Sequence, residues 1–144
     1  MTMSAIHVVR PTRNVPRSVG AVFAGFVTVA LLASATDQVL HVLNVYPPWG
    51  QPVWSPGLNA LALGYRIGYT ILGGYITARL APRAPVGHAV VLGLIGFVTA
   101  SAAAFVTITR YDLGPDWYPI LLALSGLPCS WLGGRLFRNS RLAP

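Results

Sequence analysis

Four long apolar stretches account for most of this 144-residue chain. Each is about 20 residues or longer, which is the length that an α-helix needs to cross a hydrocarbon core of about 30 Å. Short polar breaks, most of them rich in proline, separate the stretches. We therefore predict an all-α integral membrane bundle with up-down topology, whose four transmembrane helices span about residues 19–45, 57–80, 86–108 and 119–137.

The composition favours a membrane protein over a soluble domain. The chain is 54% hydrophobic and 9% charged, whereas soluble domains carry about 25% charged residues. So few charges cannot cover the surface of a soluble protein of this size. We expect one transmembrane domain at 18–138, with an N-terminal tail at 1–17 and a C-terminal tail at 139–144. The first apolar stretch is too long for the core of a signal peptide, so we expect it to be retained as a helix.

The basic residues are distributed asymmetrically about the four stretches. All ten are arginine, and eight of them fall on one side of the membrane if the helices alternate in direction. This positive-inside pattern predicts that both tails lie in the cytoplasm. A nucleic-acid-binding protein would gather its arginines on a folded polar face, so we expect the lipid bilayer as a partner and no nucleic acid. The eight are Arg10, Arg13, Arg17, Arg79, Arg83, Arg135, Arg138 and Arg141.

Small residues provide surfaces on which helices can approach each other closely. Such surfaces matter in a bilayer because lipid is as apolar as leucine and does not drive helices together. We expect the small residues of this chain to hold the four helices against one another. The motifs are Gly64-x-x-x-Gly68, Gly96-x-x-x-Ala100-x-x-x-Ala104, and the pairs Gly73-Gly74 and Gly133-Gly134.

An acid and a base interrupt the first two apolar stretches. Charges inside a membrane span are costly, so they usually face other helices and pair or serve a function. Asp37 is nine residues before Tyr46, or about 13.5 Å, and Arg66 is ten residues after Pro56, or about 15 Å. Because the two stretches share one loop, the two charges lie at similar depth. We predict an ion pair between Asp37 and Arg66.

Further polar residues lie on the same two helical faces. Helical spacing places them in two stripes that we expect to face each other. The stripes are Ser34, Asp37, His41 and Asn44 in the first stretch, and Asn59, Arg66, Thr70, Gly73 and Thr77 in the second. The predicted polar cluster consists of Asp37, His41, Tyr65, Arg66 and Tyr69, with both tyrosines able to donate to the ion pair.

The cluster has more than one interpretation. In one, the ion pair sets the register of two helices and has no chemistry. In another, His41 changes charge near neutral pH, and the cluster lines a path for a proton, an ion or a small ligand. We expect no metal and no cofactor, because Asp37 and His41 supply two ligands where zinc sites use three or four. We also expect no enzyme, since no Ser-His-acid set shares a depth and Cys129 is the one candidate nucleophile.

Several short patterns stand out between about residues 34 and 135. They are Thr36-Asp37-x-x-Leu40-His41, Tyr46-Pro47-Pro48-Trp49-Gly50-Gln51, Tyr65-Arg66, Gly73-Gly74-Tyr75-Ile76-Thr77-Ala78-Arg79-Leu80-Ala81-Pro82, Trp117-Tyr118-Pro119 and Trp131-Leu132-Gly133-Gly134. In these patterns the chain resembles small uncharacterised four-span bacterial membrane proteins. The resemblance implies an inner-membrane location and a four-helix build, and it implies no activity.

The sequence leaves little of the chain outside the bilayer, so partners must be met within the membrane or at its surface. We expect a small polytopic membrane protein that acts through intramembrane association, as a subunit, a helper or a homo-oligomer. The alternative is a proton-linked transporter or channel that uses Asp37, His41 and Arg66. The use of arginine without lysine, with abundant Ala, Gly and Pro, is typical of a GC-rich bacterial gene, so we expect a bacterial inner membrane.

Overall fold

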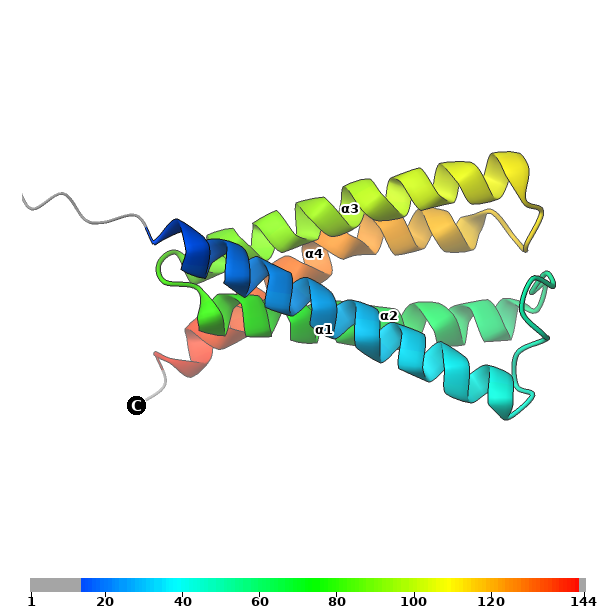
Figure 1. The fold of residues 1–144 in the computed structure, drawn as a ribbon, viewed down its shortest axis with the longest axis horizontal. Coiled ribbons are helices and arrows are strands. Elements are labelled where there is room, and N and C mark those ends of the chain that lie inside the picture. Colours follow the sequence, from blue (N-terminus) through cyan, green and yellow to red (C-terminus); the bar gives the residue numbers. More distant parts are fainter. Residues whose placement is uncertain (1–13, 143–144) are drawn as a thin grey trace, which may run out of the picture.

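The computed structural model describes residues 14–142 and is all-helical (Figure 1). The helices run alternately along the long axis, so the start of α1, the end of α4 and the turn at 81–84 lie together at what we call the terminal end. The connections 43–55 and 111–116 form the opposite, loop end. The four helices are α1 (Val15–Val42), α2 (Pro56–Leu80), α3 (Pro85–Arg110) and α4 (Trp117–Ser140).

Proline marks the start of the first three helices, because its fixed φ suits the first turn and its missing N–H would have no partner there. The prolines are Pro16, Pro56 and Pro85. Ser55 also caps α2 by accepting a hydrogen bond from the Leu58 N–H at 3.5 Å. α4 differs, because it contains Pro128 in its interior and therefore lacks one intrahelical hydrogen bond there.

The first helix is shifted toward the N-terminus relative to the predicted span at 19–45. It begins at Val15, so residues 15–17 of the predicted tail are helical, whereas residues 1–13 of that tail lie outside the described chain. It ends at Val42 because Asn44 adopts a positive φ of 56°, a conformation that terminates helices. The other three helices begin within about two residues of the predicted starts, and α4 extends to Ser140.

Three of the four described helices are long and apolar enough to cross a membrane, namely α1, α3 and α4. α2 has a similar length of 25 residues but a lower hydropathy. Arg66, Asn59 and several glycines account for this difference. The prediction of a helical membrane protein is confirmed at the level of these three helices.

Two helices, α2 and α3, each contact all three of the others. α1 and α4 do not contact each other in the described structure. α1 has the fewest buried positions, with only Ala21 and Gly25 buried along 28 residues. The bundle is therefore organised around α2 and α3, and α1 lies at its edge.

Close packing in the terminal half depends on glycine. A Cβ at Gly25 of α1 would collide with Thr77 and lie 2.7 Å from the Gly73 carbonyl oxygen of α2. A Cβ at Gly74 of α2 would collide with the Ser130 carbonyl of α4. At these crossings the backbones are close enough that only glycine fits.

The two glycine pairs pack as expected, and the longer motif of α3 packs in part, because Ala104 is buried and Gly126 of α4 approaches the Gly96 backbone. At Gly64, Gly68 and Gly96 an added Cβ would meet nothing within 4 Å. Our expectation that Gly64 and Gly68 hold helices of this chain together was wrong. The helices cross nearer the terminal end, so the middle of α2 presents Gly64 and Gly68 outward.

Candidate functional site

Asp37 and Arg66 form an ion pair between α1 and α2, with Arg66 Nη2 2.5 Å from Asp37 Oδ2. The Tyr65 hydroxyl donates to the other carboxylate oxygen, Asp37 Oδ1. Arg66 Nη1 donates in turn to the Tyr65 hydroxyl at 2.9 Å. The three side chains therefore form a closed ring of hydrogen bonds in which each carboxylate oxygen has its own donor.

Helix geometry brings these residues together. Asp37 lies about one and a half turns before the end of α1, and Arg66 lies ten residues into α2. The pair is partly buried, with side-chain exposures of 21% for Arg66 and 17% for Asp37. A guanidinium that donates to a carboxylate and a phenol in such a setting keeps its charge compensated within the protein.

Tyr69 belongs to a neighbouring contact and does not reach the ion pair. Its hydroxyl lies 2.8 Å from the Thr36 hydroxyl, one residue before Asp37 on α1. The rings of Tyr65 and Tyr69 lie 5.8 Å apart, centroid to centroid. The polar contacts between α1 and α2 thus extend over two layers, and the sequence pattern did not single out Thr36 as a partner.

His41 is held by the connection 43–55. Its Nδ1 lies 2.7 Å from the Pro47 carbonyl oxygen, which can only accept, so this nitrogen carries the proton. Its ring lies 3.9 Å from the ring of Trp49 and 5.5 Å from that of Tyr46, centroid to centroid. Within residues 14–142, no hydrogen bond joins His41 to the hydrogen-bonded side chains of Asp37, Tyr65 and Arg66. His41 therefore contacts the connection 43–55 and makes no hydrogen bond to the other members of the predicted cluster among the described residues.

Asn59 also serves the loop end, although its spacing had placed it on the face of Arg66. It is buried, and its side-chain amide donates to the carbonyl oxygens of Val53 at 2.7 Å and Ser55 at 3.0 Å. The Val53 N–H donates to the Leu113 carbonyl at 2.8 Å, which joins the two connections. The sequence signal that could have predicted this contact is the position of Asn59, one helical turn after the capping Ser55.

A cleft of about 250 Å³ lies among the four helices beside the ion pair. Arg66 and Thr70 of α2 contribute to its wall, with apolar or small residues from the other helices, including Phe26, Leu92 and Gly126. The cleft therefore brings one side of Arg66 into contact with a largely apolar space.

In the part of the chain that the structure describes, no three His, Cys, Asp or Glu side chains come close enough to hold a metal ion. Comparison with protein-family models finds no match, and comparisons with curated proteins and with solved structures find none either.

Proposed function

We propose that this chain is a small non-catalytic membrane protein that acts through helix association within the bilayer, with a second copy of itself as the first partner to test. The observation behind the proposal is the exposed small face of α2, formed by Gly57, Ala60, Gly64 and Gly68. Gly64 and Gly68 have no neighbour within 4 Å of an added Cβ. This face is therefore available to a helix outside the chain.

Glycines facing lipid make poorer contact than leucine or isoleucine would. Two glycines four residues apart, such as Gly64 and Gly68, let two helix backbones approach closely in a dimer, where dispersion contacts and weak Cα–H···O bonds accumulate. The closed ring of Asp37, Tyr65 and Arg66 lies on another face of α2 and fixes the helix against α1. Fixing α2 in this way would preorganise the open glycine face for a partner.

The test is the oligomeric state of the full chain in liposomes, measured by single-molecule photobleaching or by native mass in mild detergent. We expect dimers or larger assemblies, and at least a tenfold weaker association for the double variant Gly64→Leu/Gly68→Leu. Gly20→Leu is the matched control, because Gly20 also has nothing within 4 Å but lies on α1. A wild-type chain that is a pure monomer without a co-purifying partner would contradict the proposal.

We also propose that α2 spans the membrane with the other three helices and that both termini face the cytoplasm of a bacterial inner membrane. The support is the charge distribution: Arg17, Arg79, Arg83, Arg135, Arg138 and Arg141 gather at the terminal end, and Arg110 alone among the flanking arginines lies at the loop end. The resemblance to small four-span bacterial membrane proteins agrees with this topology.

Topology can be tested with reporter fusions in a bacterial host. A fluorescent protein fused to the C-terminus should be bright and an alkaline phosphatase fused there should be inactive, while insertion of the phosphatase between Trp49 and Gln51 should give activity. The opposite pattern would mean that the termini face outward. Equal signals at both places would mean that α2 does not span.

A second candidate is the proton-linked transporter or channel, and the cleft of about 250 Å³ beside Arg66 favours it. A solute in that cleft would sit against the one intramembrane charge pair of the chain. The test is pH-dependent flux of protons or small ions into liposomes, compared between the wild type and Asp37→Asn. Flux that is lost in the variant would support transport, and flux that is absent or unchanged would exclude this mechanism.

A further inference from the structure

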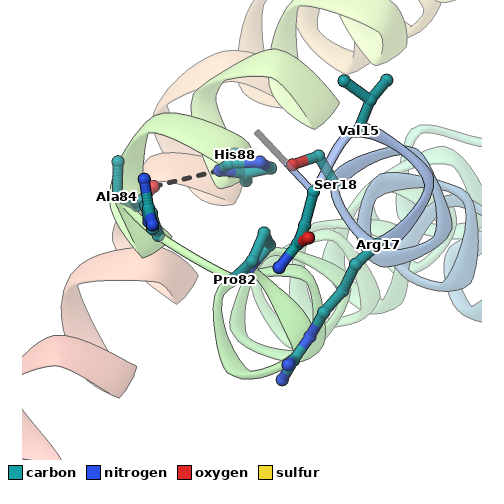
Figure 2. Close-up of a pocket in the computed structure, with 8 residues that line it drawn as sticks. Val15, Arg17, Ser18, Pro82, Ala84 and His88 are labelled. Atoms are coloured by element: carbon teal, nitrogen blue, oxygen red, sulfur yellow. Dashed lines mark hydrogen bonds between the residues drawn. The ribbon is translucent and has the colours of Figure 1, made fainter. Parts of the chain in front are cut away.

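A pocket of about 770 Å³ lies at the terminal end, between the start of α1 and the start of α3 (Figure 2). Figure 2 shows Ser18 of α1 and His88 of α3 on facing walls, with Pro82 of the connecting turn between the two helices. The polar part of the lining is completed by Asn14, Arg17 and Arg83. Ser18 and His88 are both three residues from the start of their helices, or about 4.5 Å, so the pocket lies where a membrane surface would meet the bundle.

The positive charge of this pocket has no counterpart in the chain's acidic side chains. There are three of them, at positions 37, 112 and 116. Asp37 is bound to Arg66, while Asp112 and Asp116 belong to the connection at the loop end. Arg17 and Arg83 therefore suit an anion from outside the chain.

The polar groups of the pocket retain unused donors. Arg17 donates from Nε to the Leu80 carbonyl at 3.4 Å, which leaves its two terminal nitrogens for another acceptor. His88 Nδ1 donates to the Ala84 carbonyl at 3.2 Å, so its Nε2 is an acceptor in the neutral ring and the free charged donors of the pocket are those of the arginines. Within residues 14–142, no hydrogen bond or ion pair engages Arg83. Guanidinium groups with free donors suit phosphate oxygens.

An apolar groove continues from the pocket along the bundle. It has a volume of about 560 Å³ and lies between α1 and α3, and it shares Ser18 and His88 with the pocket. From Ser18 it extends to Phe26 along α1, and from His88 to Ile95 along α3. At 1.5 Å per residue these distances are about 12 and 10.5 Å, much of the depth of one leaflet.

We propose that the pocket and the groove together form a binding site for an anionic phospholipid. The phosphate and headgroup occupy the pocket beside Arg17 and Arg83, and one acyl chain lies in the groove against Val91 and Phe23. Charge selects an anionic headgroup, and the continuity with the groove selects a lipid over free phosphate. The site lies between α1 and α3, so it is separate from the glycine face of α2.

The experiment is native mass spectrometry of the full-length protein titrated with palmitoyl-oleoyl phosphatidylglycerol or with the phosphatidylcholine of the same chains. We expect phosphatidylglycerol to bind at least tenfold more tightly. Arg17→Gln/Arg83→Gln should weaken its binding by about 10- to 30-fold. Arg135→Gln/Arg138→Gln, which removes the same charge from the same end outside the pocket, should leave it within about threefold. Equal losses in both variants would indicate general surface attraction and overturn the site.

The groove is tested separately by Val91→Trp, which adds bulk to its wall and keeps both arginines. We expect it to weaken phosphatidylglycerol binding about tenfold while the melting temperature in detergent stays that of the wild type. Inorganic phosphate at 10 mM is the second arm and should not displace the lipid. Displacement by phosphate, together with normal lipid affinity in Val91→Trp, would mean that the site binds the headgroup anion alone and would overturn the lipid assignment.

Discussion

The contact between α1 and α2 is made in two different ways along its length. Toward the loop end, long polar side chains cross from one helix to the other, with Asp37 bound to Arg66 and Tyr65. Toward the terminal end, Gly25 and Gly73 bring the two backbones close together, with Thr77 and Val29 packed against the glycines. Lipid gives no hydrophobic drive in either half, so one half relies on electrostatics and the other on close packing.

The difference predicts which half tolerates substitution. A close-packed glycine crossing leaves no free space between the two helices, because any Cβ must push the backbones apart. A polar contact between long side chains can be weakened one group at a time. Four groups of substitutions test this contrast, in order of decreasing expected effect.

Gly25→Leu should have the largest effect, a loss of about 3 kcal/mol or more, because its side chain would collide with Thr77 and the Gly73 backbone. Denaturation of the purified protein in mixed detergent micelles measures the loss. Gly20→Leu on the same helix is the control, since nothing lies within 4 Å of it, and should change stability by less than about 0.5 kcal/mol. Equal stability of the two variants would mean that the glycine crossing does not hold the helices.

Asp37→Asn and Arg66→Gln should each cost about 2 to 3 kcal/mol, because each leaves one intramembrane charge without its partner. The double variant should recover much of that loss, which a double-mutant cycle measures as a coupling energy. Asp112→Asn changes an exposed acid at the loop end and should be neutral. Additive losses in the double variant would show that the two charges do not act as a pair.

Tyr65→Phe should cost about 1 kcal/mol, since it removes the donor to Asp37 Oδ1 and the acceptor from Arg66. Tyr69→Phe should cost less, about 0.6 kcal/mol, because it removes one contact between two hydroxyls. The same denaturation assay applies, with the exposed Tyr111 changed to Phe as the reference. The reverse order of the two losses would place the principal polar contact at Thr36.

Thr77→Val should have the smallest effect, within about 0.5 kcal/mol. Thr77 is fully buried at the glycine crossing, and its hydroxyl has no hydrogen-bond partner in the described structure. Replacing an unpaired hydroxyl with a methyl group of similar size removes no hydrogen bond. Thr77→Ala, which leaves a gap against Gly25, should be the more costly change. A large loss in Thr77→Val would reveal a polar contact in this half after all.

Sequence reasoning located the polar half better than the packed half. Counting residues from a shared loop was enough to match the depths of Asp37 and Arg66, because a helix rises by a fixed 1.5 Å per residue. Tyr69 and His41 lie on the expected faces, but a face does not specify the partner: Tyr69 reaches Thr36, and His41 is held by Pro47 and Trp49.

The glycine contacts could not be assigned in the same way. α2 carries Gly64, Gly68, Gly73 and Gly74, and every pair among them at suitable spacing could serve a crossing. Which pair is used depends on the angle at which a neighbouring helix crosses α2 and on the position of that crossing along α2. The sequence of α2 alone specifies neither the angle nor the position. The structure places the crossings at 73 and 74, which leaves the other two glycines free for a partner.

The ion pair also bears on how the chain enters the membrane. It joins two consecutive helices across one short connection, so both charges emerge from the ribosome before α3 is made. If α2 spans the membrane, as we propose, α1 and α2 entering as a hairpin would present a neutral pair to the bilayer, whereas α2 alone would present a bare arginine. We therefore expect Asp37→Asn to reduce membrane insertion of a truncated chain that ends after α2, measured by glycosylation mapping. In this respect Asp37 would act as a counter-charge during synthesis, before any folded bundle exists.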